Sequence, residues 1–203
     1  MNFSHTLKTP NELAKVGEYI TSPAQNDQQK RWESISAYIK AFNFQIGAEL
    51  GVSTGLNFDN LMILNPNLRL YGIDSFESEG NEFEKYDGGI YQGRTQNNAI
   101  KNAKQIENKY VGRAMMIFKR TDEACEIIPD GHLDFVFIDA DHTYEGVMKD
   151  IEMWEPKVQD NGLIMGHDLN WGSVARAVGE KFSNFWIAAD NVWASPKYWY
   201  NEF

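Results

Sequence analysis

A single cysteine, a shortage of basic residues and the lack of long hydrophobic runs each exclude a class of protein. Cys125 alone allows no internal disulfide and no signal peptide is legible, so we expect a reducing, cytoplasmic setting. Only 19 Lys and Arg residues stand against 29 Asp and Glu, and the net charge of -10 disfavours nucleic acid as a partner. The longest apolar runs are of strand length, far below the roughly 20 residues of a membrane-spanning helix. We therefore expect no membrane span.

What the sequence does contain is enough for one folded domain. With 203 residues, 42% of them hydrophobic and 13% aromatic, the chain can bury a core that offsets the entropy of folding. From residue 43 onward, short apolar runs alternate with amphipathic segments, which is typical of an α/β domain with a mostly parallel sheet. The sequence thus divides into a helical extension, 1–42, and an α/β domain, 43–203.

Short apolar runs predict a sheet of seven strands. Five lie at 44–50, 69–74, 114–119, 133–139 and 162–167, and two form a C-terminal antiparallel hairpin within 185–195, broken at Asp190-Asn191. Helices are predicted at 28–41, near Leu56, and at 96–110, 144–158 and 173–182. A short helix at 11–20 and a turn-rich connection at 21–27 have no assigned role. The insertion 77–94, rich in Glu, Gly and Tyr, predicts a lid that closes over a ligand, or else an acidic surface loop.

The strongest local motif follows the first predicted strand. It reads Glu49-Leu-Gly-Val-Ser-Thr-Gly55, and its glycines would let the backbone approach a ligand closely. A dinucleotide loop needs Gly-x-Gly-x-x-Gly, but positions 53 and 56 are Ser and Leu, so a nicotinamide cofactor is disfavoured. Asp74, at the end of the second strand, can bind both hydroxyls of a ribose. The loop and the acid together predict an adenosine-containing ligand, although the glycines alone could serve only a tight turn.

These two motifs resemble those of the class I S-adenosylmethionine-dependent methyltransferases, whose first-strand loop carries an acid-x-Gly-x-x-x-Gly pattern. The resemblance implies a single Rossmann-like methyltransferase domain that uses S-adenosyl-L-methionine. It also implies that Gly51 and its neighbours meet the methionine part, Asp74 the ribose and Thr121-Asp122 the adenine edge. The implied cofactor-binding set comprises Glu49, Gly51, Ser53, Gly55, Asp74, Ser75, Thr121, Asp122 and Asp139.

Two further strands end in acidic residues. The segments read Leu133-Asp-Phe-Val-Phe-Ile-Asp-Ala-Asp-His-Thr-Tyr-Glu-Gly-Val147 and Asn161-Gly-Leu-Ile-Met-Gly-His-Asp168. Because the carboxyl ends of parallel strands meet at one edge of a sheet, these polar residues should converge near the cofactor. They are Asp139, Asp141, His142, His167 and Asp168. Carboxylates with an imidazole suit a divalent ion such as Mg²⁺ or Mn²⁺.

These segments resemble the metal-dependent O-methyltransferases of the catechol and caffeoyl-coenzyme A type and, more closely, a related small family with an Ile-Asp-Ala-Asp-His-x-Tyr-Glu stretch. The resemblance implies Asp139, His167 and Asp168 as metal ligands. His167 stands where those relatives carry an Asp, so it could bind the metal through a neutral nitrogen or act as a general base in a metal-free site. The predicted catalytic residues are Asp139, His142 and His167.

The sequence therefore predicts methyl transfer from S-adenosylmethionine to a hydroxyl of a small molecule, such as a sugar or a phenol, assisted by a divalent metal. Two alternatives stay open: a metal-independent methyltransferase with a His base, and a non-catalytic module that binds S-adenosylmethionine. Tyr144 could reach an acceptor hydroxyl or only serve the helix start, and Trp154, Trp186 and Trp193 are predicted core residues. A homo-oligomer is possible.

Overall fold

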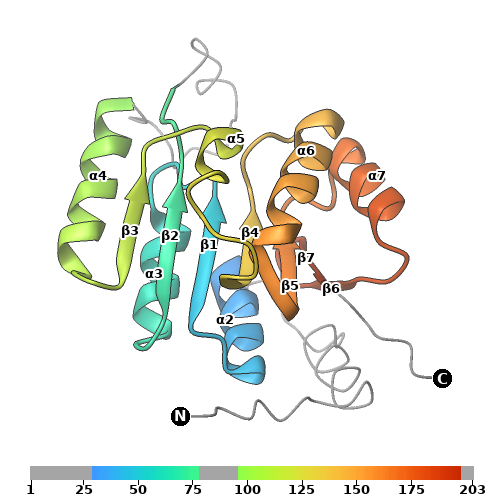
Figure 1. Cartoon of the computed structure of the whole chain (residues 1–203), viewed down its shortest axis with the longest axis horizontal. Coiled ribbons are helices and arrows are strands. Elements are labelled where there is room, and N and C mark those ends of the chain that lie inside the picture. Colours follow the sequence, from blue (N-terminus) through green and yellow to red (C-terminus); the bar gives the residue numbers. More distant parts are fainter. Residues whose placement is uncertain (1–28, 78–95, 198–203) are drawn as a thin grey trace.

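The computed structural model describes residues 29–77 and 96–197, which form a seven-stranded sheet in the order β3-β2-β1-β4-β5-β7-β6 (Figure 1). The strands are β1 (Ile46–Leu50), β2 (Arg69–Ile73), β3 (Ala114–Ile117), β4 (Leu133–Ile138), β5 (Val158–Gly166), β6 (Trp186–Ala188) and β7 (Val192–Pro196). The first five pair in parallel, whereas β7 runs antiparallel to both β5 and β6. The predicted fold, a mostly parallel sheet with a C-terminal hairpin, is confirmed.

Helices cover both faces of this sheet (Figure 1). They are α2 (Arg31–Phe42), α3 (Leu56–Leu64), α4 (Gln96–Lys109), α5 (Thr121–Ala124), α6 (Tyr144–Trp154) and α7 (Gly172–Lys181), with a 3₁₀ turn, η2 (Glu155–Lys157). On β4, Phe135 and Phe137 join the core beneath α2, α3 and α4, while Val136 and Ile138 join the core beneath α6 and α7. The central strands β1 and β4 are buried on both sides, which explains why they read as nearly continuous apolar runs.

Helix α2 is the described part of the predicted extension 1–42, and it packs directly on the sheet. Ile35 and Tyr38 are fully buried, and the Tyr38 ring stacks on Trp186 of β6 at 5.9 Å between centroids. Packing against the last strands brings the N-terminal end of α2 to the carboxyl edge of the sheet. The predicted helix at 11–20, the connection at 21–27 and nearly all of the predicted lid at 77–94 lie outside the described residues.

The two largest differences from the predicted boundaries lie at the end of α6 and at the start of β5. Helix α6 ends at Trp154 rather than at residue 158, because Pro156 lacks the N–H that would continue the helix and the chain tightens into η2. Strand β5 consequently begins at Val158, earlier than the predicted 162. Helix α5 spans a single turn, too short for hydrophobic periodicity to reveal it.

The strand order reverses between β1 and β4, where neighbouring connections leave the sheet in opposite directions. Leu50 pairs with Ile138 at the ends of these two strands, so the loops that follow them start side by side. In open α/β sheets, ligands bind in the crevice at such a switch point. No helix within the described ranges is long and apolar enough to cross a membrane.

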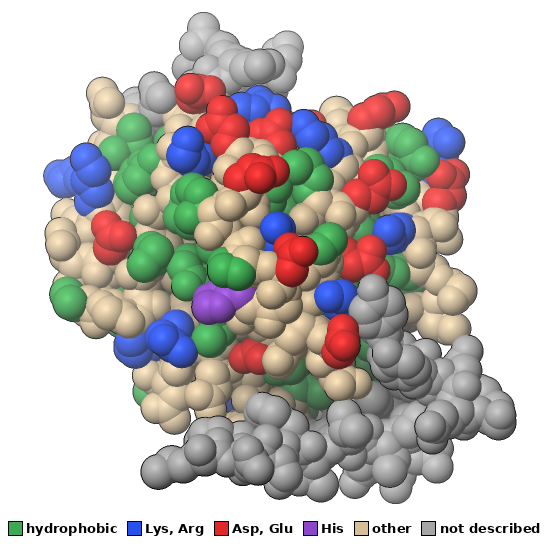
Figure 2. Space-filling view, viewed as in Figure 1, with side chains coloured by type: hydrophobic (Ala, Val, Ile, Leu, Met, Phe, Trp, Pro, Cys, Tyr) green, Lys and Arg blue, Asp and Glu red, His purple; other side chains and the backbone are tan. Residues whose placement is uncertain are grey.

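The described surface carries both signs of charge. On the face drawn in Figure 2, Lys and Arg side chains are interspersed with Asp and Glu instead of gathering into one broad basic patch.

Candidate active site

The loop after β1 is shaped by its backbone. Gly51 has φ +85° and Gly55 has φ +83°, both in the left-handed region that favours glycine. A Cβ at Gly51 would lie 2.1 Å from the carbonyl oxygen of Asp139, and a Cβ at Gly55 would lie 2.3 Å from a side-chain carbon of Ile106. Gly51 is therefore required both by its φ and by its approach to the backbone at the end of β4, whereas Gly55 is favoured by its φ, because the Ile106 side chain can move.

Asp74 holds this loop from the end of β2. One carboxylate oxygen accepts the backbone N–H of Ser53 at 2.8 Å, and the other accepts that of Phe76 at 2.7 Å. Ser53 and Phe76 both have positive φ, at 51° and 53°, so the carboxylate stabilises two strained positions. Ser75 follows Asp74 directly, and its hydroxyl oxygen accepts the backbone N–H of Glu77 at 3.3 Å. The predicted ribose acid thus also organises the loop that would surround a ligand.

Glu49 lies beneath the loop, on β1, with 1% of its surface exposed. Burial raises the pKa of its carboxyl well above the usual range, and the nearby Asp139 raises it further, while Arg31 and Asn57 oppose the shift. One of its oxygens has no hydrogen-bond partner among the described residues. A buried acceptor without a partner is costly, and an amino-bearing ligand in the crevice would satisfy it.

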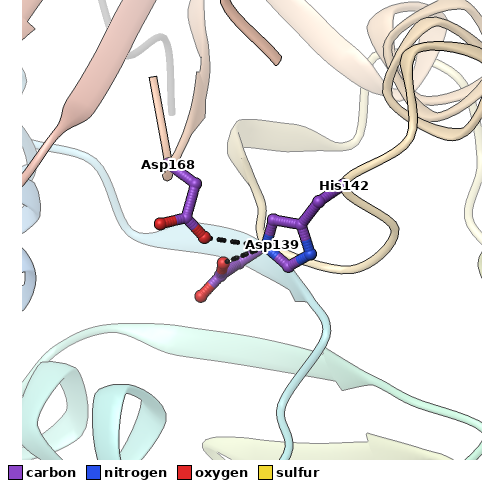
Figure 3. Close-up of side chains that lie close together, drawn as sticks. All are labelled: Asp139, His142 and Asp168. Carbon is purple, nitrogen blue, oxygen red and sulfur yellow. Dashed lines mark ion pairs between the residues drawn. The ribbon is translucent and has the colours of Figure 1, made fainter. Parts of the chain in front are cut away.

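At the ends of β4 and β5, two carboxylates converge on one imidazole (Figure 3). His142 Nε2 lies 2.7 Å from an oxygen of Asp168 and 3.5 Å from an oxygen of Asp139. One donor atom from each of the three residues lies within 4.8 Å of the others, a spacing that fits a shared metal ion. The geometry thus groups His142 with Asp139 and Asp168, whereas the sequence predicted His167 as the imidazole ligand.

His167 lies immediately behind this group, only 7% exposed. Its Nδ1 is 3.0 Å from an oxygen of Asp168 and 3.7 Å from one of Asp139. Its backbone carbonyl accepts the indole N–H of Trp193 at 3.2 Å, and Gly166 leaves room for that ring, since a Cβ there would lie 2.4 Å from it. Trp193 is thus a core residue, as predicted, and it also fixes the end of β5.

The carboxylates change the pKa values of both imidazoles. Hydrogen bonds with Asp139 and Asp168 raise the pKa of His142 to about 9, although burial lowers it. Burial lowers the pKa of His167 too, but Asp168, Asp190 and Asp139 outweigh it and raise that pKa to about 9. Burial opposes ionisation of Asp168, yet its bonds to the two histidines hold its pKa well below the usual range. At neutral pH the histidines are therefore protonated in this arrangement.

Two members of this cluster were not found from the sequence. The Arg31 guanidinium donates to a carboxylate oxygen of Asp139, and its Nε lies 3.9 Å from an oxygen of Asp190. Asp190, in the turn between β6 and β7, also accepts the Arg31 backbone N–H at 2.9 Å and lies 3.8 Å from His167 Nε2. Three carboxylates thus face three positive groups. The sequence did carry one signal for Arg31, which is the first residue of α2. The helix dipole disfavours a basic residue in the first turn of a helix, so Arg31 there indicates nearby acidic groups.

Other predicted residues lie elsewhere. Thr121 and Asp122 begin α5, where Asp122 forms ion pairs with Lys149 of α6 at 2.6 Å and with Arg120 at 3.3 Å. The Tyr144 hydroxyl donates to Glu180 of α7 at 2.6 Å, so it is engaged away from the carboxylate cluster. Asp122 and Tyr144 thus have exposed partners, whereas the Thr121 carbonyl accepts the indole N–H of the buried Trp154 at 3.2 Å.

A small pocket opens beside the cluster. Its lining combines charged and apolar side chains, which include Asp139, Asp141, His142, Val147, His167, Val174 and Trp193. Trp171, at the start of α7, packs its ring 5.1 Å from that of His142. The pocket thus offers titratable groups together with aromatic and aliphatic surface.

Comparisons with known proteins show the family of the chain and relatives of its fold. Residues 44–169 match a family model described as a methyltransferase domain. A candidate caffeoyl-CoA O-methyltransferase from Staphylococcus aureus shares 18% identity, with 96% of this chain and 94% of that one covered and a TM-score of 0.63. An O-methyltransferase from Bacillus cereus in complex with SAH shares 13% identity, with 94% and 93% covered and a TM-score of 0.57. No curated protein matches the sequence.

Proposed function

Because this chain belongs to the methyltransferase-domain family, we propose that it transfers a methyl group from S-adenosylmethionine to a hydroxyl of a small molecule, assisted by a divalent cation. One observation carries the proposal: the loop of Gly51 lies directly against Asp139, so a donor above the loop would adjoin the His142 cluster. Methyl transfer from a sulfonium is an in-line displacement that mainly requires the donor and the acceptor to be aligned.

The donor half would use the residues around β1 and β2. Asp74 has lone pairs left beyond its two bonds to backbone N–H groups, and these could accept the ribose hydroxyls. The unpartnered oxygen of Glu49 could accept from the amino group of the methionine part. We keep Ser53, Ser75, Thr121 and Asp122 as proposed donor contacts.

The acceptor half would use Asp139, His142 and Asp168 as ligands of the cation. Two carboxylates and one imidazole suit a hard or borderline divalent ion, and their spacing fits a single ion. A cation held there would make an acceptor hydroxyl more acidic. His167 would take the hydroxyl proton once its own imidazole is neutral. A cation nearby favours that neutral imidazole, because a positive charge lowers the pKa of His167.

A second candidate drops the metal. The guanidinium of Arg31 already lies on Asp139, so the carboxylates are balanced by the protein's own positive groups. In that case His142 or His167 would act as a general base only after losing its own proton, so turnover without a cation should rise as the pH approaches the imidazole pKa of about 9. A small hydroxylated molecule is the proposed partner under both candidates, in a cytoplasmic setting.

The deciding experiment is a calorimetric titration with S-adenosylmethionine, followed by a screen of phenols and sugars with Mg²⁺, with Mn²⁺ and with a chelator. We expect donor binding without metal and methyl transfer that requires metal. Asp168→Asn should abolish the response to metal while donor binding persists, whereas Asp130→Asn, at an exposed ion pair with Lys157, should change neither. Turnover that survives chelation would favour the metal-free candidate, and absent donor binding would contradict both.

A further inference from the structure

Arg31 is the group in this site that a metal-assisted reaction does not explain. It is the first residue of α2, it is separated from Asp139 by 108 positions, and it lies outside the 44–169 segment that matches the family model. Asp190, its second partner, lies outside that segment as well. The flanks of the chain therefore add a positive group and a carboxylate to a cluster that the matched segment already contains.

Fastening α2 to the domain does not require this ion pair. The apolar face of α2 is buried, and the Arg31 backbone N–H already bonds to Asp190 at 2.9 Å. The guanidinium nevertheless extends past Asp190 and donates to Asp139, whose side chain is only 13% exposed. A buried carboxylate shared by two cations is unfavourable, because the cations repel each other at short range in a medium less polar than water.

We propose that Arg31 is an internal competitor for the cation site: its guanidinium occupies Asp139, and a divalent ion binds there only as the guanidinium withdraws. The inference rests on the metal-assisted form of the proposed function. Asp190 can hold the guanidinium in the withdrawn state, since the Nε of Arg31 is already 3.9 Å from it. Helix α2 thus sets how tightly the metal binds.

A supporting role for Arg31 predicts the opposite change in metal affinity. If Arg31 only oriented Asp139 as a ligand, its removal would weaken metal binding, as happens when outer partners of metal ligands are lost. If it competes, its removal strengthens binding. The sign of the change in metal affinity therefore separates the two roles, and a merely structural contact would leave the affinity unchanged.

The test measures Mn²⁺ affinity of the full chain by electron paramagnetic resonance, without donor or acceptor. We expect Arg31→Met and Arg31→Gln to bind Mn²⁺ roughly tenfold more tightly than the unchanged protein, and Arg31→Lys, which keeps the charge, to stay close to it. Arg113→Met is the matched control. It removes the same charge at the amino end of β3, where Arg113 bonds to the Leu68 carbonyl, and should leave the affinity unchanged.

Equal or weaker Mn²⁺ binding by both Arg31 variants would overturn the inference, as would the absence of Mn²⁺ binding in every protein. A gain of the same size in Arg113→Met would also overturn it, because general charge would then explain the effect. Calorimetry with S-adenosylmethionine on the same samples separates this failure from that of the proposed function. A protein that does not bind the donor contradicts the proposed function, whereas unchanged Mn²⁺ affinity contradicts only the role of Arg31.

Discussion

The two halves of the site are built in different ways. At the ends of β1 and β2, the site is a backbone structure: Gly51, Ser53, Gly55 and Phe76 have positive φ, and Asp74 binds backbone N–H groups. At the ends of β4 and β5, it is a cluster of charged side chains drawn from separate elements. The first half depends on conformations that few residues can adopt, and the second depends on which charges the fold brings together.

This difference explains how much of the site could be predicted. The proposed donor half lies within one strand-helix-strand unit, so glycine spacing and the acid at the second strand end were enough to predict that Gly51, Gly55 and Asp74 would lie around one loop. In the proposed acceptor half, the sequence predicted only the residues that follow the ends of the strands. Arg31 and Asp190 were missed because their partners are remote in sequence, and the choice between His142 and His167 depends on side-chain direction.

The fold itself was predictable for a related reason. Each of the five parallel strands contains a short apolar run, with β1 and β4 at the buried centre of the sheet. The hairpin turn falls at Asp190 and Asn191, two residue types that tolerate the positive φ found there. The errors lie where a local rule overrides periodicity. Pro156 shortened the predicted helix before β5, and α5 is a single turn.

The sharpest test of the backbone half is Gly51→Ala. The added Cβ would lie 2.1 Å from the Asp139 carbonyl at φ +85°, so we expect loss of donor binding and a fall of about 3 kcal/mol or more in the free energy of unfolding. Gly112→Ala is the control, because φ is +77° there and the Cβ would meet nothing within 4 Å. It should cost only about 1 kcal/mol. Urea unfolding and calorimetry measure both, and equal losses would refute the close-approach argument.

Asp74→Ala tests whether the donor half also depends on a side chain. The alanine releases the backbone N–H groups of Ser53 and Phe76 and removes the proposed ribose acceptor, so donor affinity should fall by roughly 1.5 to 3 kcal/mol. Asp59→Ala, which removes an ion pair between α3 and Lys109 of α4, is the control and should not alter donor affinity. Unchanged donor binding by a folded Asp74→Ala protein would remove Asp74 from the site.

Asp150→Asn tests how a buried carboxylate outside the cluster affects stability. Burial raises the Asp150 pKa from 3.8 to about 6, despite its hydrogen bond with Thr121. The folded protein therefore binds the extra proton between these values, so stability falls as pH rises from about 4 to about 6 and is flat above. Removing the charge should stabilise the fold at pH 8 by about 1 to 3 kcal/mol and change little near pH 4. Denaturant titrations at both pH values measure this, and equal stability at pH 8 would contradict it.

The smallest expected effect is that of Tyr144→Phe, and it tests whether sequence proximity or spatial proximity defines the charged half. Tyr144 lies two positions after His142 in the motif, yet its hydroxyl donates to Glu180, and Arg176 stacks on its ring at 4.2 Å. This is an exposed arrangement between α6 and α7. Its loss should leave donor affinity, Mn²⁺ affinity and the melting midpoint within experimental error, because exposed ion networks add little stability.

His142→Gln, the paired variant, should instead lose Mn²⁺ binding. A loss of methyl transfer in Tyr144→Phe with Mn²⁺ binding intact would show that the tyrosine turns toward the acceptor during the reaction, and the charged half would then extend along α6.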